Sequence, residues 1–322
     1  MKDPYALWDK SEITRRKKFC DEDSRKIIDR CLKINPIKPY YVAELKNFRA
    51  LDTLFKLHPN FTELLTFLRG IFLDCIASGV GFGSPNILLV GSPGIGKTHF
   101  MNALSEALGL SYMICSGGVL DDALTLVGTD PKYSGAAPGS LAMLVIESDD
   151  YNQLLLFDEI DKIGAEGSHP IMPVLLAMLE DETACQFRDN FFGAAFDLSG
   201  VSVVATANSI SGLPPELLSR FLVFNIPDPT EQQLRAVAMM MLRDFRSTRL
   251  FLSEKVSKEF LDKCSTFLPR DLKKALAGAV GEALSVYCGK HGEEAIVDLA
   301  PGSIDLEPSY LKPAFSKIKI GF

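Results

Sequence analysis

The sequence predicts an α/β protein in which a parallel, doubly wound sheet is followed by an all-helical C-terminal domain. Three observations support this fold class. Short apolar runs alternate with helical patterns between residues 87 and 226, a glycine-rich phosphate-loop motif joins the first run to a helix, and only helical periodicity follows residue 226. With 322 residues, of which 47% are hydrophobic, the chain is long enough for about two domains with sizeable cores.

The phosphate loop is the most informative stretch of the sequence. The apolar run Ile87–Val90 is typical of a buried strand, and it leads into the motif G-x-x-x-x-G-K-[ST] and then into a helical pattern. Such a loop binds a polyphosphate through backbone N–H groups, a helix N-terminus and a lysine. A glycine-rich turn that matches by chance would lack these flanking elements. We expect ATP with Mg²⁺ here, bound by Gly91, Ser92, Pro93, Gly94, Ile95, Gly96, Lys97, Thr98 and His99.

The remaining strands are expected at short apolar runs separated by helices or loops. They are Ser111–Cys115, Gln153–Phe157, Val201–Thr206 and Leu222–Ile226, and a helix is expected over Phe61–Ile76. Alternating strands and helices specify a parallel sheet with helices on both faces and ligands at the carboxyl ends of the strands. The large nucleotide-binding domain is therefore expected over residues 59–226.

The two flanking regions are both expected to be helical. Residues 1–58 form a short helical N-terminal arm, an accessory segment whose basic cluster Arg15–Lys18 is either a solvated helix face or a contact for nucleic acid or another partner. Residues 227–322 form a small helical lid domain. Its first helix is predicted to begin with a capping box between Thr230 and Gln233, and a later helix is predicted to begin at Pro269.

Composition limits the classes of function and the location. The net charge of −7 argues against a surface dominated by phosphate-neutralising side chains, although a local basic loop stays possible. The sequence contains no apolar stretch of the roughly 18 to 20 residues that a membrane span needs, and no apolar signal core at the N-terminus. The seven cysteines are scattered singly, which predicts buried thiols rather than disulfides or a zinc site. We expect a cytoplasmic protein with no membrane partner.

Hydrolysis of a bound triphosphate needs a metal ligand and a group that orders water. Asp158 and Glu159 follow an apolar run, so that Asp158 is expected to hold Mg²⁺ together with Thr98, and Glu159 is expected to polarise the attacking water. Asn208 ends another apolar run and is expected to emerge between the first two strand ends, where its neutral amide can orient water. An ordinary asparagine turn would give the same spacing.

Several longer stretches make the chain resemble an AAA+ P-loop ATPase, and within that superfamily the ATPase module of the Lon protease family. The resemblance extends from about residue 86 to residue 277. Besides the phosphate loop, it includes the segments CSGGVLDDALTLVGTDPKYSGAAPGSL, LLLFDEIDKIG, FRDNFFGAAFDLSGVSVVATAN and LPPELLSRFLVFNI. These segments are far more specific than the nucleotide motifs alone.

The resemblance implies roles for Arg220, Asn208 and Arg270. Arg220 matches the arginine finger, which stabilises charge at the γ-phosphate bound by a neighbouring subunit. Asn208 matches the first sensor and Arg270 the second sensor, which reports the nucleotide state by moving the small domain. Because a finger that acts on a neighbour requires an assembly, the resemblance implies a homo-oligomeric ring, with a hexamer as the expected form.

Tyr133 matches an aromatic residue that grips an extended polypeptide from a loop facing the central pore. The next residue departs from the family, which has an aliphatic side chain where this chain has Ser134, so a weaker grip is expected. An exposed turn residue beside Gly135 is the alternative for Tyr133. Phe191 and Phe192 fit either a second pore loop or the anchor of a hairpin. The sequence has no counterpart of the family's protease domain or of its long N-terminal substrate-recognition region.

The sequence therefore predicts an ATP-hydrolysing ring protein that remodels, unfolds or threads a macromolecule, with a polypeptide client expected and no peptidase of its own. A separate protease could be its partner. The alternative is a nucleotide-dependent factor that acts on DNA or RNA, with TRRKK and the pore loops contacting phosphates; the acidic net charge weighs against it. A third possibility is a scaffold that binds ATP without turnover, which the competent residue types at each position disfavour.

Overall fold

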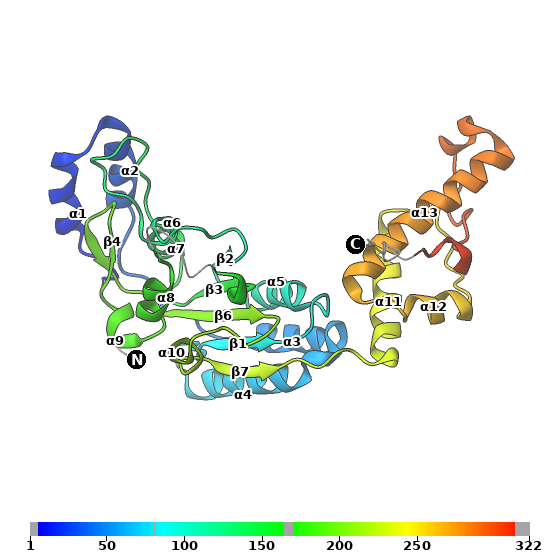
Figure 1. The fold of residues 1–322 in the computed structure, drawn as a ribbon, viewed down its shortest axis with the longest axis horizontal. Coiled ribbons are helices and arrows are strands. Elements are labelled where there is room, and N and C mark those ends of the chain that lie inside the picture. Colours follow the sequence, from blue (N-terminus) through cyan, green and yellow to red (C-terminus); the bar gives the residue numbers. More distant parts are fainter. Residues whose placement is uncertain (1–5, 80, 164–169, 313–322) are drawn as a thin grey trace, which may run out of the picture. The chain divides into compact units, whose positions relative to one another are not determined.

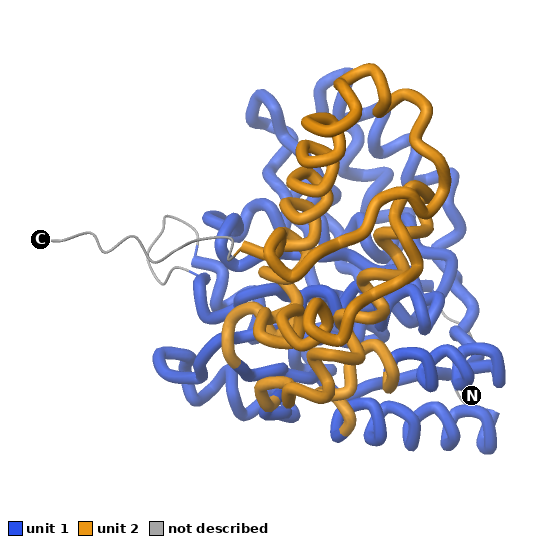
Figure 2. The backbone as a smooth tube through the Cα atoms, turned by 90° about the vertical axis from the view of Figure 1, so that its right-hand side faces the viewer, with its two compact units in different colours: residues 1–54, 63–91, 98–226 blue, residues 55–62, 92–97, 227–322 orange. Residues whose placement is uncertain are grey.

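The computed structural model describes residues 6–79, 81–163 and 170–312, and the chain divides into two compact units. The first unit comprises residues 1–54, 63–91 and 98–226, and the second comprises residues 55–62, 92–97 and 227–322 (Figure 2). The second unit thus takes the end of the chain together with two short earlier stretches. The ends of the expected arm and lid, residues 1–5 and 313–322, lie outside the described residues.

A five-stranded parallel sheet with strand order β2-β3-β6-β1-β7 forms the centre of the first unit (Figure 1). The strands are β1 (Ile87–Val90), β2 (Tyr112–Ser116), β3 (Gln153–Asp158), β6 (Val201–Ala207) and β7 (Leu222–Asn225). The strands expected from the sequence are confirmed to within about one residue at each end. The placement expected for Asn208 agrees with this strand order. Asn208 follows β6, which lies between β1 and β3 and therefore between the first two strands of the chain, while β2 takes the edge.

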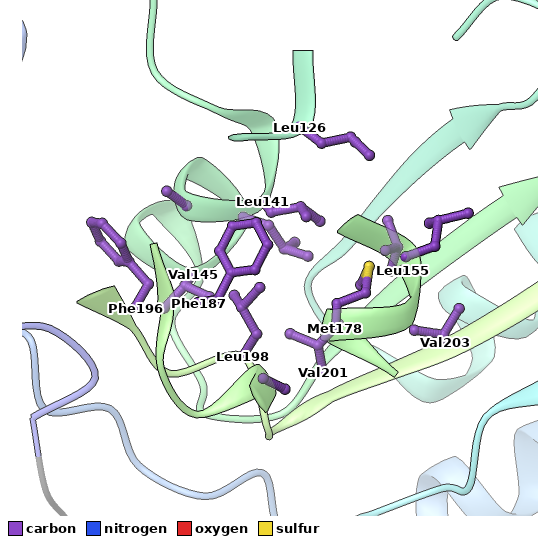
Figure 3. Packing of buried hydrophobic residues seen from close by; sticks show 14 of the residues in the cluster. Leu126, Leu141, Val145, Leu155, Met178, Phe187, Phe196, Leu198, Val201 and Val203 are labelled. Carbon is purple, nitrogen blue, oxygen red and sulfur yellow. The ribbon is translucent and has the colours of Figure 1, made fainter. Parts of the chain in front are cut away.

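Both faces of the sheet are covered, because alternate residues of each strand point to opposite faces. On one face Leu155 of β3 and Val203 of β6, which are paired in register, pack with Met178 in the main hydrophobic core (Figure 3). On the other face the ring of Phe224 in β7 contacts Phe67, with ring centroids 5.5 Å apart. The carboxyl ends of the strands are thereby held at one edge of a rigid layer.

Most helices of the first unit lie between the strands or before them. They are α1 (Lys10–Arg16), α2 (Glu22–Lys33), α3 (Leu45–Leu57), α4 (Thr62–Ser78), α5 (Lys97–Leu108), α6 (Leu124–Val127), α7 (Ser140–Glu147), α8 (Met172–Met178), α9 (Asp181–Ala184) and α10 (Pro215–Leu218). The expected helix over 61–76 is α4. The helix expected after the phosphate loop is α5, which begins at Lys97.

The N-terminal residues pack as part of the first unit. Trp8 forms an antiparallel bridge with Phe196, and the side chains of Ile13 in α1 and Ile28 in α2 are fully buried in the main core. The sequence predicted a helical accessory segment over residues 1–58. Its helices α1 and α2 bury their apolar faces in the main core of the first unit.

A small antiparallel hairpin stands beside the main sheet. It is formed by β4 (Phe187–Asp189) and β5 (Ala194–Phe196), which the sequence analysis did not predict. Phe191 and Phe192 in its turn are both 0% exposed and belong to the main core. Of the two interpretations that the sequence left open, these rings are therefore anchors of the hairpin.

The second unit is helical in its C-terminal part. Its helices are α11 (Glu231–Ser247), α12 (Lys258–Cys264) and α13 (Pro269–His291), and the predicted capping box between Thr230 and Gln233 is present at the start of α11. Phe260 and Leu276 are fully buried in its core.

All seven cysteines are free, and four of them are buried. Within the described ranges, every helix is too short or too polar to cross a membrane.

Candidate nucleotide-binding site

The phosphate loop joins β1 to α5, the strand and helix that the motif requires. Gly94 and Gly96 have φ angles of +85° and +99°, a region in which side chains are strained. An added Cβ on Gly96 would meet nothing within 4 Å, so the backbone angle, rather than space, requires glycine there. The N–H of Gly91 donates to the carbonyl of Ala207 at 3.2 Å and thereby extends the pairing of β1 with β6.

The loop is closed by its own lysine. The Nζ atom of Lys97 donates to the carbonyl oxygen of Ser92 at 3.0 Å, and Lys97 is only 7% exposed. Ile95 is buried, whereas Ser92, Pro93, Thr98 and His99 are exposed to solvent. The ammonium group of Lys97 therefore lies within the phosphate loop, where a lysine can bind the phosphate oxygens of a nucleotide.

Asp158 ends β3 and accepts hydrogen bonds from two threonine hydroxyls. Thr98 donates to its Oδ2 atom at 2.8 Å and Thr206 donates to its Oδ1 atom at 2.6 Å. Thr98 lies in the first turn of α5, and Thr206 lies in the neighbouring strand β6. A hydroxyl beside a carboxylate is a donor set that suits Mg²⁺, which prefers hard oxygen ligands and takes few of them from the protein. These residues therefore fit the expected metal.

The backbone at Glu159 is strained. Its φ angle of +56° is the one positive value found at a non-glycine residue in the described part of the chain. Such a conformation costs about 1–2 kcal/mol and is typical of functional sites when the surroundings enforce it. The enforcing contacts are present: the N–H of Glu159 donates to the hydroxyl of Thr206 at 2.9 Å, and Gly117 donates its N–H to the carbonyl of Asp158 at 2.7 Å.

The side chain of Glu159 already has a partner. Its Oε2 atom lies 2.7 Å from Nζ of Lys162, in a pair whose members are 34% and 51% exposed. Gly117 lies against the backbone of Glu159 and has no room for a side chain, because an added Cβ would lie 2.3 Å from the carbonyl oxygen of Glu159. The carboxylate of Glu159 is thus held at the end of β3 by a strained backbone and by a partly exposed ion pair.

Asn208 follows β6 directly and is tied to the segment after β3. Its backbone N–H donates to Oδ2 of Asp161 at 3.0 Å. The other carboxylate oxygen of Asp161, Oδ1, is buried and has no hydrogen-bond partner within the described residues. The strand ends that carry Asp158, Glu159 and Asn208 are therefore joined by side-chain hydrogen bonds as well as by the sheet ladder.

The two arginines expected from the resemblance lie on different units. Arg220, two residues after α10, forms an ion pair with Glu180 and donates to the carbonyl of Glu216, while its Nε atom is buried without a partner in the described part of the chain. Arg270 is the second residue of α13 in the second unit and is exposed. In the same unit, Leu268 contacts the phosphate loop, because an added Cβ on Gly94 would lie 3.4 Å from its Cδ1 atom.

The loop that carries Tyr133 is anchored at its base and open at its tip. Tyr133 is 70% exposed. At the base, Asp189 of the hairpin accepts from the N–H of Gly139 at 2.8 Å, and Asn190 donates its side-chain N–H to the carbonyl of Gly128 at 3.0 Å. The hydrogen bonds therefore hold the base of the loop in place, while the side chain of Tyr133 at its tip is exposed to solvent.

Sequence reasoning missed several residues that build the site. Thr206 is the clearest, since it is 0% exposed and bridges Asp158 to the backbone of Glu159. A polar residue within the otherwise mostly apolar run VSVVATA was the available signal. Lys162, Gly117 and Glu180 had no such signal. The roles of Gly117 and Glu180 depend on contacts with segments distant in the sequence, and the role of Lys162 depends on the local backbone turn after β3.

Comparisons with known proteins match the segment of the chain that carries this site. A model of the "ATPase family associated with various cellular activities (AAA)" matches residues 87–227. The Lon protease of Dictyoglomus thermophilum is 36% identical over 154 residues, which cover 48% of this chain and 19% of that protein. A peroxisomal Lon protease homolog 2 of Spinacia oleracea is 35% identical over 178 residues, 55% of this chain and 20% of that protein. The chain thus spans about a fifth of the length of these curated relatives.

A solved structure extends the likeness in fold. A closed-state reconstruction of Hsp104 with ATPγS and casein matches 76% of this chain and 48% of that chain, with a TM-score of 0.59 and 17% sequence identity. At this identity the match concerns the fold alone. Residues 87–227 are therefore similar to the AAA family of ATPases, and this part of the sequence is also similar to Lon proteases.

Proposed function

We propose that the chain hydrolyses ATP in a ring of identical subunits and uses the cycle to remodel, unfold or thread a polypeptide. The observation that carries this proposal is the hydrogen-bonded series from Thr98 through Asp158 and Thr206 to the backbone of Glu159. A structural aspartate needs no such arrangement. This series of hydrogen bonds aligns the metal-binding pair Thr98 and Asp158 with Glu159, whose backbone is strained. Water activation beside a bound phosphate requires such an alignment.

Each residue of the nucleotide site has a separate role in the proposed hydrolysis. Lys97 and the N–H groups of the phosphate loop bind the phosphates, while Thr98 and Asp158 hold Mg²⁺, which neutralises charge on the phosphate oxygens. Glu159 orients and polarises the attacking water once its contact with Lys162 is released. Asn208 and Arg270 respond to the γ-phosphate.

Arg220 is proposed to complete the site of the neighbouring subunit. Its pair with Glu180 is partly exposed, so exchange of this carboxylate for a phosphate costs little. A guanidinium supplied by a neighbour requires an assembly, and we propose a hexamer. The Lon and Hsp104 likenesses favour a polypeptide client contacted by Tyr133.

Peptidase activity is not part of this proposal. A partner protease would supply it if the client is degraded. We also propose a cytoplasmic location, where a reducing environment would preserve the buried thiols.

Two variants test the shared site when they are mixed. Glu159→Gln should bind ATP but lower turnover by at least about 100-fold, and Arg220→Ala should do the same for a different reason. In a mixed ring, an Arg220→Ala subunit keeps its own Glu159 and receives Arg220 from a Glu159→Gln neighbour. We expect the mixture to regain part of the parent turnover.

The matched control is Glu63→Gln, which changes an exposed glutamate of α4 and should retain full turnover. Full turnover of Glu159→Gln alone would contradict the assignment of the base. Absence of any recovery in mixtures at every ratio, with both variants binding ATP, would contradict the shared site.

A further inference from the structure

A cavity of about 960 Å³ lies on the first unit, away from the phosphate loop. Three segments that are distant in the sequence line it: the N-terminal helix α1 with the 3₁₀ turn Lys17–Phe19, the loop of Tyr133, and the turn of the β4–β5 hairpin. In Figure 1 α1 and β4 lie close together. The first of these segments precedes residues 87–227, so the nucleotide-binding match does not account for it.

Arg16 ties the three segments together. Its Nη2 atom lies 2.7 Å from Oδ2 of Asp130 in the Tyr133 loop and donates to the carbonyl of Asn190 at 3.0 Å. The approach is close, since an added Cβ on Gly193 would lie 3.1 Å from Cδ of Arg16. Because one side chain holds both the loop and the hairpin, the cavity exists before any ligand binds.

Two aromatic side chains line the cavity and are exposed to solvent. Tyr133 and Phe19 are each 70% exposed, one from the loop and the other from the N-terminal segment. A phenylalanine left largely in water, in the lining of a preformed cavity that also contains a second exposed aromatic residue, is typical of a contact surface rather than of a monomer's ordinary surface. Phe19 is therefore a second aromatic contact that the family likeness does not supply.

The charges at the cavity favour an acidic ligand. Arg15 and Arg188 donate to the backbone carbonyls of Ser11 and Gly193, and neither forms an ion pair within the described ranges. The three carboxylates of the cavity are engaged: Asp130 with Arg16, and Asp189 and Glu12 with backbone N–H groups.

We propose that this cavity binds an extended polypeptide segment in which an aromatic or large aliphatic side chain is flanked by acidic residues. The apolar side chain packs between Phe19 and Tyr133, and the acidic residues pair with Arg15 and Arg188. This inference rests on the proposed polypeptide-remodelling function and names the client chemistry that it selects. A nucleic acid fits less well, because its continuous phosphate backbone would bring more negative charge to this chain of net charge −7 than Arg15 and Arg188 can neutralise.

The test is direct binding of a fluorescent peptide to the full chain in the presence of Mg-ATP. The probe is an unstructured peptide with a Phe-Leu pair flanked by glutamates, and a second probe has lysines in place of the glutamates. Phe19→Ala should weaken binding of the acidic probe about tenfold, since the buried part of a large aromatic contact is lost. The double variant Arg15→Glu with Arg188→Glu should reverse the preference between the two probes.

Leu250→Ala is the matched control, since Leu250 is 71% exposed but lies outside the cavity, and it should bind both probes within about twofold of the parent protein. Because Phe19, Arg15 and Arg188 are exposed, their variants should melt as the parent does. Parent-like binding by Phe19→Ala, or equal effects of the double charge variant on both probes, would overturn the proposal. So would displacement of the acidic probe by a single-stranded oligonucleotide that binds more tightly.

Failure of this inference is distinguishable from failure of the proposed function. Peptide binding is measured without turnover, whereas the function is tested by the recovery of hydrolysis in mixed rings. Recovery in mixed rings with unchanged peptide binding by Phe19→Ala overturns only the cavity. Loss of peptide binding in Phe19→Ala without recovery in mixed rings overturns only the shared ATP site.

Discussion

The nucleotide site and the cavity lined by Phe19 and Tyr133 each contain an aspartate that ends a strand, yet the two carboxylates are held differently. Asp158 accepts from the hydroxyls of Thr98 and Thr206 at a partly exposed strand end. Asp189 is 1% exposed and accepts from the backbone N–H groups of Gly139 and Phe192, each at 2.8 Å. A hydroxyl can rotate away and accept or bind a metal instead, whereas a backbone N–H cannot.

This difference separates a binding carboxylate from a structural one. At Asp158 the partners can be exchanged for a ligand, so the carboxylate is available for chemistry. At Asp189 the partners are fixed parts of the Tyr133 loop and of the hairpin turn, so the carboxylate fastens two segments together. An aspartate after an apolar run is therefore not by itself evidence of a metal site, and the kind of donor around it decides.

The largest expected effect comes from the backbone that supports the nucleotide site. In Gly117→Ala the new Cβ would lie 2.3 Å from the carbonyl oxygen of Glu159, so the strained turn must move. We expect a loss of about 2–3 kcal/mol in the free energy of unfolding and a fall in ATP turnover of more than about 100-fold. The control is Gly118→Ala, whose Cβ would meet nothing closer than 3.7 Å. Equal turnover in the two variants would refute the role of this turn.

The next largest effect is expected from removal of the Thr206 hydroxyl, which donates to Asp158 and has no counterpart among the described residues at Asp189. Thr206→Val keeps the shape of the buried side chain but removes the donor to Asp158 and the acceptor for the N–H of Glu159. Turnover should fall about 10- to 100-fold while ATP affinity changes little, because the lost contacts orient catalytic groups. Thr206→Ser restores the hydroxyl and should recover most of the turnover. A serine variant as slow as the valine variant would point to packing instead.

The Tyr133 region should respond to pH through Asp189. Burial raises the pKa of Asp189 to about 7, although hydrogen bonds from Phe192 and Gly139 and the charge of Arg16 oppose the rise. The folded protein then binds this proton more tightly than the unfolded chain, in which the pKa is 3.8. The stabilisation is fully present below about pH 4 and is lost as the pH rises through about 7.

Urea unfolding at pH 5 and pH 8 measures this dependence. The parent protein should lose about 2 kcal/mol more than Asp189→Asn between these pH values, because the variant lacks the titrating group while other groups are shared. The variant itself is expected to be less stable at both pH values, since an amide leaves one of the two backbone N–H groups facing another donor. Parallel pH dependences in the two proteins would show that Asp189 does not titrate in this range.

The smallest expected effect concerns the ion pair at Glu159. Lys162→Met removes a partly exposed partner and frees the carboxylate, so turnover should rise about two- to threefold with little change in melting temperature. Lys46→Met, which removes an exposed pair with Glu44 elsewhere, should leave turnover unchanged. A tenfold fall in Lys162→Met would instead make Lys162 part of the catalytic machinery.

The strands and the phosphate loop could be predicted because their signals are local. Apolar runs such as Ile87–Val90, the capping box at Thr230 and the glycines at 94 and 96 each depend on a few neighbouring residues and on the backbone angles those residues favour. The hairpin over residues 187–196 was only one of two interpretations that the sequence left open, because its strands are short and its turn is held by the core rather than by turn residues alone.

The sequence by itself determined the order of strands and helices and the residue types at the nucleotide site, since hydrophobic periodicity and the phosphate-loop motif act over short stretches of chain. Only the tertiary structure decided the insertion of β6 between β1 and β3, the bridging role of Thr206, and the pairing of Arg16 with Asp130. These depend on which distant segments become neighbours. Where such a contact is buried, each polar group needs its partner, because a buried donor or acceptor without one costs about 1–3 kcal/mol.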